Sequence, residues 1–397
     1  TMLSYLVYAI IGIVLLIKGN HYADFLPLKF APFAYLFTML LIALVPSIQY
    51  DRAQIHSVDM PSMKWLNIFS WIYFVCTICT IGFYISNILS GMTTLFGSAD
   101  GGAELYSEYQ IQDAQNDNKI SNLPIIFFNT FSVIACLLLI YYLVVDIKHK
   151  YIYVCGYAIC VAMRFLIFLA MGMRTIVAMS FFNIVAAYMA LRLLFDEKKR
   201  KWLRHIALWT AIITLIPIAV LTKSRFNEMD GGVSEGLIYY FGQAPIYFNN
   251  YGMDANGLRN GDRTANFYKQ MLGMNPPNGI FDVRDTYSDM LMNDSVFSTF
   301  VGDFTLDFGP TTTAILFIIF SIVFAWASRP NTEHQIPFYK LILAYLAMTV
   351  CLQGGMYLFF YSFTEAISFI GTILFYGAFG IHYWYKNKDL QASPNKE

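Results

Sequence analysis

The sequence predicts an all-α integral membrane protein whose chain crosses the bilayer about ten times. Of its 397 residues, 57% are hydrophobic and 17% aromatic, whereas only 13% are charged. Soluble domains carry roughly 25% charged residues, so lipid is the better solvent for this chain. The mean hydropathy is +0.51, and apolar runs long enough to cross a bilayer recur along the sequence. These observations exclude a soluble domain as the fold class.

The crossings are expected where the apolar runs lie. A hydrocarbon core of ~30 Å needs about 20 apolar residues in a helix, because backbone polar groups cannot stay unsatisfied in lipid. The runs span residues 2–18, 31–49, 65–92, 123–146, 151–171, 175–195, 205–222, 310–328, 338–360 and 363–385. The first run is short and Arg164 interrupts the fifth, so these two fit the criterion least well.

The orientation follows from lysine and arginine in the short loops. The link 196–204 holds five basic residues, and further lysines lie between the fourth and fifth runs and after the last run. The loop 94–122 is acidic instead. Cytoplasmic loops carry the excess of basic residues. Ten crossings then place both termini in the cytoplasm and the acidic loop outside.

Several classes of function have no support in the sequence. The formal net charge is zero, so no long-range field favours a nucleic acid. All six cysteines lie inside apolar runs, which indicates no disulfide framework. We find no P-loop and no histidine or cysteine pattern typical of zinc. The first apolar run lacks a basic start and a cleavage site, so we expect it to be retained.

One long polar segment, residues 223–309, separates the seventh and eighth runs and lies outside in this topology. A loop of that length is uncommon unless it is functional. Residues 236–251 are rich in tyrosine and phenylalanine, which favours a helix at the membrane interface. Residues 252–285 are dense in glycine, asparagine and aspartate, which predicts a surface loop.

Three arginines are the candidate anion-binding residues. Arg164 lies within an apolar run, and Arg174 and Arg225 lie at the outer ends of their runs. A charge inside the membrane is costly unless it is paired or hydrated, and guanidinium groups bind phosphate oxygens bidentately. An embedded diphosphate is therefore the expected ligand. The structural alternatives are an ion pair between Arg164 and Glu365, and snorkelling to the headgroups for Arg225.

Three carboxylates accompany these arginines. Asp303 and Asp307 are spaced i, i+4, so on a helix they share one face. The glycines and proline of GDFTLDFGP indicate a bend there. Glu365 begins the last apolar run. The structural alternatives are an N-cap for either aspartate and a helix-start charge favoured by the dipole for Glu365.

The order of several motifs resembles the Wzy-type oligosaccharide repeat-unit polymerases of bacterial O-antigen and capsule assembly. The similar strings are MGMRTIVAMSFFNIVAAYMALRLLF, DEKKRKWLRH, a run that ends in TKSRF, YYFGQAPIYF in the long loop, and FSTFVGDFTLDFGPTTTAILF. The ordered match covers residues 165–328. Each motif is weakly specific, and their order, spacing and topology together are more so.

The resemblance implies a fold and an activity. The fold would be GT-C-like, in the bacterial inner membrane with the active site facing the periplasm. Such polymerases transfer a glycan from undecaprenyl diphosphate to another lipid-linked repeat unit, without a nucleotide sugar, a cofactor or a known essential metal. Donor, acceptor and membrane lipid would be the partners, and no nucleic acid. Contacts with a chain-length regulator and a flippase stay open, as do the sugars and the linkage.

The resemblance also assigns roles to residues. The family's outer arginines fall on Arg174 and Arg225, which would bind the diphosphate with support from Arg164. The departing diphosphate gains negative charge, which preorganised cations stabilise. Asp303 and Glu365 are the candidate general bases for the acceptor hydroxyl. The long loop would hold sugars, with contacts from Tyr240, Gln243, Tyr247 and Asp307.

Two other functions stay open at this point. An O-antigen ligase would share the architecture, but that class typically uses a histidine in its large external loop, and residues 223–309 contain none. A polysaccharide flippase or transporter would line a pathway with buried charges. The long external loop and the lack of an internal repeat disfavour a transporter.

Overall fold

The computed structural model describes most of the chain and is almost entirely helical. The described residues are 2–19, 26–98, 100–115, 122–205, 216, 232–277, 279–292, 298–331, 334–355 and 363–392. The helices are α1 (Met2–Lys18), α2 (Phe30–Arg52), α3 (Met63–Gly97), α4 (Gly101–Gln115), α5 (Leu123–Thr130), α6 (Ser132–Val144), α7 (Lys150–Ala170), α8 (Arg174–Leu191), η1 (Arg192–Leu194), α10 (Gly232–Tyr251), α11 (Asn266–Met271), α12 (Gly279–Thr286), α13 (Thr299–Ala327), α14 (Phe338–Gln353) and α15 (Phe363–Ala392).

Six of the described helices are long and apolar enough to cross a membrane. They are α2, α3, α7, α8 together with η1, α13 and α15. The predicted run 123–146 is not one straight helix, because α5 and α6 meet at a 58° bend. The runs 2–18 and 338–360 form the shorter apolar helices α1 and α14. The run 205–222 lies almost entirely outside the described residues. The chain is thus a helical membrane protein, and ten crossings stay a prediction.

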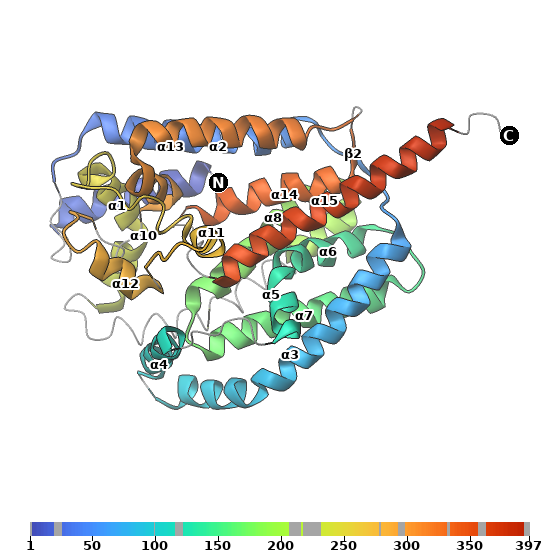
Figure 1. The fold of residues 1–397 in the computed structure, drawn as a ribbon, viewed down its shortest axis with the longest axis horizontal. Helices are drawn as coiled ribbons and strands as arrows, with labels where there is room; N and C mark the ends of the chain where they lie inside the picture. Colours follow the sequence, from blue (N-terminus) through green and yellow to red (C-terminus); the bar gives the residue numbers. More distant parts are fainter. Residues whose placement is uncertain are drawn as a thin grey trace.

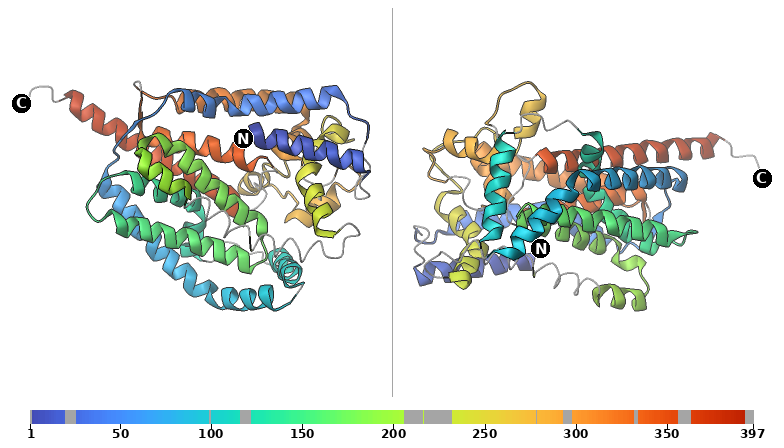
Figure 2. Two further views of the ribbon diagram at one scale, coloured as in Figure 1. Left: turned by 180° about the vertical axis from the view of Figure 1, so that it is seen from behind. Right: turned by 90° about the horizontal axis from the view of Figure 1, so that it is seen from below.

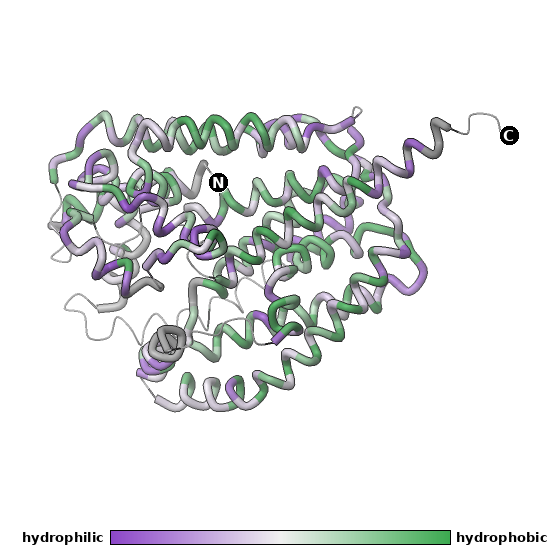
Figure 3. Tube along the Cα trace, viewed as in Figure 1, coloured by the Kyte–Doolittle hydropathy of each residue, from purple (hydrophilic) through white to green (hydrophobic). Residues whose placement is uncertain are grey.

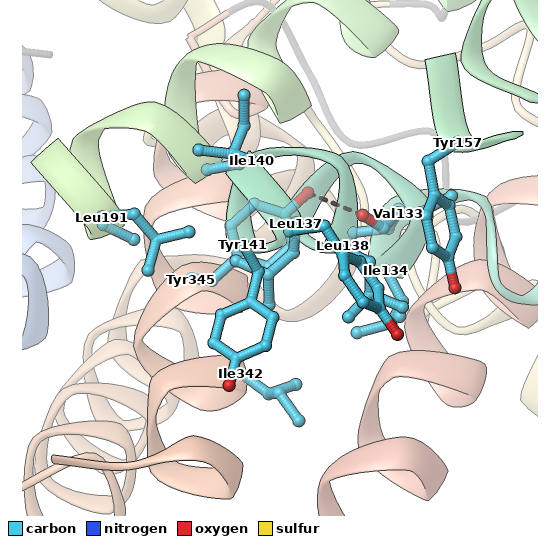
Figure 4. Packing of buried hydrophobic residues seen from close by; sticks show 14 of the residues in the cluster. Val133, Ile134, Leu137, Leu138, Ile140, Tyr141, Tyr157, Leu191, Ile342 and Tyr345 are labelled. Atoms are coloured by element: carbon cyan, nitrogen blue, oxygen red, sulfur yellow. Dashed lines mark hydrogen bonds between the residues drawn. The ribbon is translucent and has the colours of Figure 1, made fainter. Parts of the chain in front are cut away.

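The long helices lie side by side along the longest axis of the molecule (Figures 1 and 2). Helix α14 is central, because one side contributes Leu341 and Tyr345 to the largest apolar cluster and another contributes Leu346 and Val350 to the second. In the largest cluster, the Tyr345 hydroxyl donates to the Val133 carbonyl at 2.8 Å (Figure 4). Each half of the bundle is therefore packed against the same helix.

A short parallel strand pair marks one end of the bundle. Strands β1 (Ser57–Asp59) and β2 (Gln335–Pro337) pair in register, and they join the start of α3 to the start of α14. An exposed ion pair between Arg192 and Asp51 lies nearby, after α8 and at the end of α2. We call this end of the bundle the clip end.

Polar residues concentrate at the two ends of the bundle, and the middle of the long helices is apolar (Figure 3). The end opposite the strand pair is covered by residues 252–277 and 279–292, which we call the cover segment, and we name that end the cover end (Figure 1). The predicted helix at 236–251 is confirmed as part of α10, which crosses α1 (Figure 2). A Cβ on Gly12 would lie 2.7 Å from the Gly242 carbonyl oxygen, so glycine permits this close crossing.

Candidate functional site

The cover segment is folded tightly onto the first half of α13. The Arg259 backbone N–H donates to the Leu306 carbonyl at 2.9 Å, and the Leu291 N–H donates to the Ala255 carbonyl at 3.0 Å. Met290 and Met292 pack with Leu306 in a small apolar cluster. The prediction of a surface loop at 252–285 is therefore wrong for its middle part, which is buried against a helix.

Arg259 and Asp307 form the most buried ion pair of this contact. Their Nε and Oδ1 atoms are 2.9 Å apart, and the side chains are 2% and 0% exposed. The other carboxylate oxygen of Asp307 accepts hydrogen bonds from the backbone N–H and the hydroxyl of Thr264, each at 2.7 Å. Arg259 also donates from Nη2 to the Asp303 carbonyl at 3.0 Å. One oxygen of Asp307 is therefore ion-paired with Arg259, and the other is hydrogen-bonded to Thr264.

Arg263 and Asp303 repeat the arrangement one helical turn away. Arg263 Nε lies 3.0 Å from Asp303 Oδ1, and both side chains are 2% exposed. The Ser298 hydroxyl donates to the same oxygen at 3.3 Å. The prediction that Asp303 and Asp307 share a helix face is confirmed, because both meet the cover segment. Neither aspartate is an N-cap, because the residues before the two helical parts of α13 are Ser298 and Gly309.

The bend expected in GDFTLDFGP occurs at Gly309. Its φ of 78° and ψ of 162° are not helical, and Pro310 follows. Only glycine adopts this backbone conformation without strain, and proline at the next position has no N–H that would need an intrahelical partner. The kink separates the part of α13 that carries the two aspartates from its apolar part, residues 310–327.

A second layer of polar contacts surrounds the Arg259 pair. The Tyr287 hydroxyl donates to Asp262 Oδ2 at 2.5 Å and lies 3.0 Å from the Arg259 carbonyl. Lys269 pairs with the other oxygen of Asp262. Burial, followed by the hydrogen bond to Asp262, raises the pKa of Tyr287 above its ordinary value. The tyrosine therefore remains a neutral donor across the physiological pH range.

Loss of this donor has a modest expected effect. We expect Tyr287→Phe to lower the free energy of unfolding by about 1 kcal/mol at pH 7, because one partly exposed hydrogen bond to a carboxylate is removed. Since folding raises the pKa of Tyr287, its contribution is present below the ordinary value of 10.0 and declines as the pH rises through the folded pKa. Thermal unfolding of the purified variant tests this, and an unchanged midpoint at pH 7 would contradict it.

The ion pair between Arg164 and Glu365, which was the structural alternative to an anion site at Arg164, is present. Arg164 Nη2 lies 3.0 Å from Glu365 Oε1, and the side chains are 5% and 8% exposed. Arg164 also donates from Nη1 to Asn129 Oδ1 at 3.1 Å, and its guanidinium lies 5.0 Å from the Phe168 ring centroid. Asn129 is two residues before the break between α5 and α6. Glu365 lies in the first turn of α15, where the dipole also favours it.

The two groups of ion pairs lie at the same end of the bundle. Phe267 of α11 contacts Phe363 edge-on at 5.5 Å and packs with Ala366, the neighbour of Glu365. The Phe300 N–H donates to the Gly354 carbonyl at 2.9 Å, so the start of α13 meets the end of α14 here. The cover segment thus lies beside the start of α15 and over the start of α13.

The remaining predicted site residues are only partly described. Arg225 and the side chains of Arg174 and Tyr240 lie outside the described part of the structure. Gln243 is buried in α10, and the Tyr247 hydroxyl lies 3.1 Å from that of Tyr239. The backbone of Arg174 follows a turn at Gly172, whose φ is +68°.

Helix α4 packs on that turn. A Cβ added at Gly172 would lie 3.0 Å from the Gly102 carbonyl oxygen and from the Tyr106 nitrogen. Leu105 of α4 clusters with Phe168 and Ile176 on either side of the turn. Phe168 also contacts the Arg164 guanidinium. The side chain of Phe168 therefore links the turn that leads to Arg174 with the Arg164–Glu365 pair.

Arg259 and Arg263 were not predicted from the sequence as site residues. A signal was present, because Arg259 and Arg263 are spaced i, i+4, as are Asp303 and Asp307. Two arginines and two aspartates with the same spacing can form two ion pairs side by side. The glycine and asparagine between the arginines predicted a surface loop instead, because such residues are typical of surface loops.

The geometry limits what these groups do chemically. Each described arginine of the site is paired with a carboxylate, so the net charge of the three pairs is close to zero. Asp303 and Glu365 are each paired through one carboxylate oxygen, with Arg263 and Arg164 respectively. Among the described residues, no group of three or more His, Cys, Asp or Glu side chains could hold a metal ion.

The fold and the buried charges define a helical membrane protein with a covered polar site at one end. Comparison with known proteins adds no narrower class. No family model, no curated protein and no solved structure matches this chain.

Proposed function

We propose that the protein is a membrane glycosyltransferase that polymerises undecaprenyl-diphosphate-linked oligosaccharide repeat units at the outer face of the bacterial inner membrane. The observation that carries the proposal is the cover segment, which is fixed by buried Arg–Asp pairs over one end of the helices. An ordered polar layer at one membrane face suits an enzyme that meets glycans there. A transporter would need charged residues along a path through both leaflets.

The orientation of the site follows from the basic residues. At the clip end, short connections and helix ends carry basic side chains that are exposed or half-buried, which are Arg52, Lys64, Arg192, Arg329 and Lys386. Basic residues in short loops favour the cytoplasm, whereas those in a long loop have little influence on topology. The clip end would then be cytoplasmic and the cover end periplasmic, with ten crossings and both termini in the cytoplasm.

The proposed mechanism relies on positioned charge. Arg174 and Arg225 would bind the diphosphate, whose negative charge grows as the glycosyl bond breaks. Arg164 is already paired with Glu365, so we assign it a supporting role in which it fixes the start of α15. Asp303 and Glu365 remain the candidate bases. The aromatic and polar side chains of α10 would contact sugars, among them Tyr240, Gln243 and Tyr247, and Asp307 would hold the cover segment in place.

Deletion of the gene tests the proposal. In the bacterium that encodes the chain, we expect the deletion strain to carry single repeat units on its surface, and the wild-type gene to restore a ladder of polymers on a gel. Loss of all surface repeat units with accumulation of lipid-linked material would instead indicate a ligase or a flippase. A normal ladder in the deletion strain would overturn the proposal directly.

A further inference from the structure

A cavity of about 380 Å³ lies at the clip end, far from the buried ion pairs. Ser62, His382, Tyr385 and Lys386 line it. Ser62 immediately precedes α3, and the other three residues belong to the last turns of α15. The cavity therefore lies where the start of one long helix meets the end of another.

Two cationic or polar side chains face this cavity from one side of α15. His382 and Lys386 are spaced i, i+4, so they share a helix face. The neighbouring residue Tyr383 fixes this part of α15, because its hydroxyl accepts a hydrogen bond from Asn331 Nδ2 at 3.2 Å and its ring lies 5.3 Å from that of Tyr339. The cavity wall is thus held by the connection between α13 and α14.

The α3 side of the cavity also favours a negative ligand. Within the described residues, the Ser62 side chain makes no capping hydrogen bond, and the first turn of α3 contains no acidic residue. Lys64 lies in that turn. A helix N-terminus carries partial positive charge and unsatisfied N–H groups. The hydroxyl, the helix end and the side chains of His382 and Lys386 therefore complement an anion.

Exposed tryptophans indicate the depth of the cavity in the membrane. Trp65 and Trp384 flank it in sequence and are 58% and 57% exposed. The Lys388 ammonium lies 5.2 Å from the Trp384 ring centroid. Tryptophan and lysine gather at the level of the lipid headgroups. The cavity is then within reach of lipid phosphates on the basic face of the protein.

We propose that this cavity binds a phosphate group, supplied by the headgroup of an anionic phospholipid. Lys386 and the Ser62 hydroxyl contact the phosphate oxygens, His382 adds a further donor, and Tyr385 closes the apolar side. The proposal rests on the helical membrane fold and is independent of the glycosyltransferase activity.

Binding of a short-chain lipid to the purified full chain tests this site. The probe is dioctanoyl phosphatidylglycerol, with dioctanoyl phosphatidylcholine for comparison, in a neutral detergent. We expect Lys386→Gln to weaken phosphatidylglycerol binding by about fivefold or more, because a charge-assisted hydrogen bond is lost. Lys388→Gln is the matched control, since Lys388 carries the same charge two residues further along α15 but does not line the cavity. We expect this control to change phosphatidylglycerol binding by less than about twofold.

The competing sources of phosphate are distinguished in the same assay. Competition by inorganic phosphate at similar concentrations would support a phosphate site that does not need the lipid, and its failure to compete would support recognition of the headgroup within a lipid. Ser62→Ala, which changes no charge, should also weaken binding while the melting temperature stays at the wild-type value. Equal binding of phosphatidylcholine, or equal weakening by Lys388→Gln, would overturn the proposal.

Discussion

Replacement of Asp307 by alanine is expected to destabilise the cover end by about 3–5 kcal/mol, because it leaves a charged guanidinium buried without its partner. Arg259 is 2% exposed and loses the carboxylate that lies 2.9 Å away. The N–H and hydroxyl of Thr264 lose their acceptor in the same change.

Limited proteolysis and thermal unfolding of the purified protein measure this effect. We expect Asp307→Ala to unfold at a lower temperature and to be cleaved faster at Lys269 and Arg284, which the cover segment carries. Asp289→Ala is the matched control, since Asp289 is an exposed carboxylate of the same segment, and it should behave as the wild type.

A double variant separates charge burial from packing. Arg259→Met combined with Asp307→Leu removes both charges and keeps apolar volume, and such replacements are often neutral or stabilising. We expect the double variant to unfold closer to the wild type than Asp307→Ala does. If Asp307→Ala alone is as stable and as resistant to protease as the wild type, the ion pair does not hold the cover segment.

The Arg164–Glu365 pair shows which contacts the sequence can predict. Both residues lie in or at the ends of long apolar runs, where an unpaired charge is costly. Few opposite charges are available at the same depth, so the number of candidate partners is small. Of the two alternatives that the sequence left open for Arg164, the structure shows the ion pair, at 3.0 Å. Because charged residues are scarce in the apolar segments of a membrane protein, the possible partner of each one can be identified from the sequence.

The cover segment shows where prediction from sequence fails. Its composition resembles that of solvent-exposed loops, because glycine and asparagine are needed for turns such as those at Asn256, Asn260 and Gly261, all with positive φ. Burial of Arg259 and Arg263 depends on contact with α13, whose aspartates lie about forty to fifty residues further along the chain. Local composition cannot reveal a contact of that separation.

The break between α5 and α6 was missed for a related reason. The run 123–146 is apolar throughout, and hydropathy alone does not distinguish a straight helix from a bent one. The bend of 58° lies beside Asn129, whose side chain accepts a hydrogen bond from Arg164. The partner that accompanies the bend lies on α7, so the local sequence carries no signal for it.

Arg174→Ala is expected to abolish polymer formation, with a fall in activity on the order of 100-fold or more, because the proposed diphosphate site would lose a cation. Arg174 begins α8 directly after the turn at Gly172, one layer away from the Arg164–Glu365 pair. The measurement is the polymer ladder of the deletion strain complemented with each variant, together with the amount of protein in the membrane. Arg225→Ala is expected to behave in the same way.

A control at the other end of the same helix makes this result specific. Arg192 follows α8 at the clip end, where it pairs with Asp51 on the surface, and Arg192→Ala should leave the ladder intact. Lysine at position 174 keeps the charge but not the planar fork that binds phosphate oxygens bidentately, so Arg174→Lys should restore little activity. Full activity of the lysine variant would mean that position 174 requires only a positive charge. A normal ladder from Arg174→Ala, at wild-type protein levels, would mean that Arg174 does not bind the diphosphate. Helix α8 would then contribute no residue to the proposed site beside the buried ion pairs.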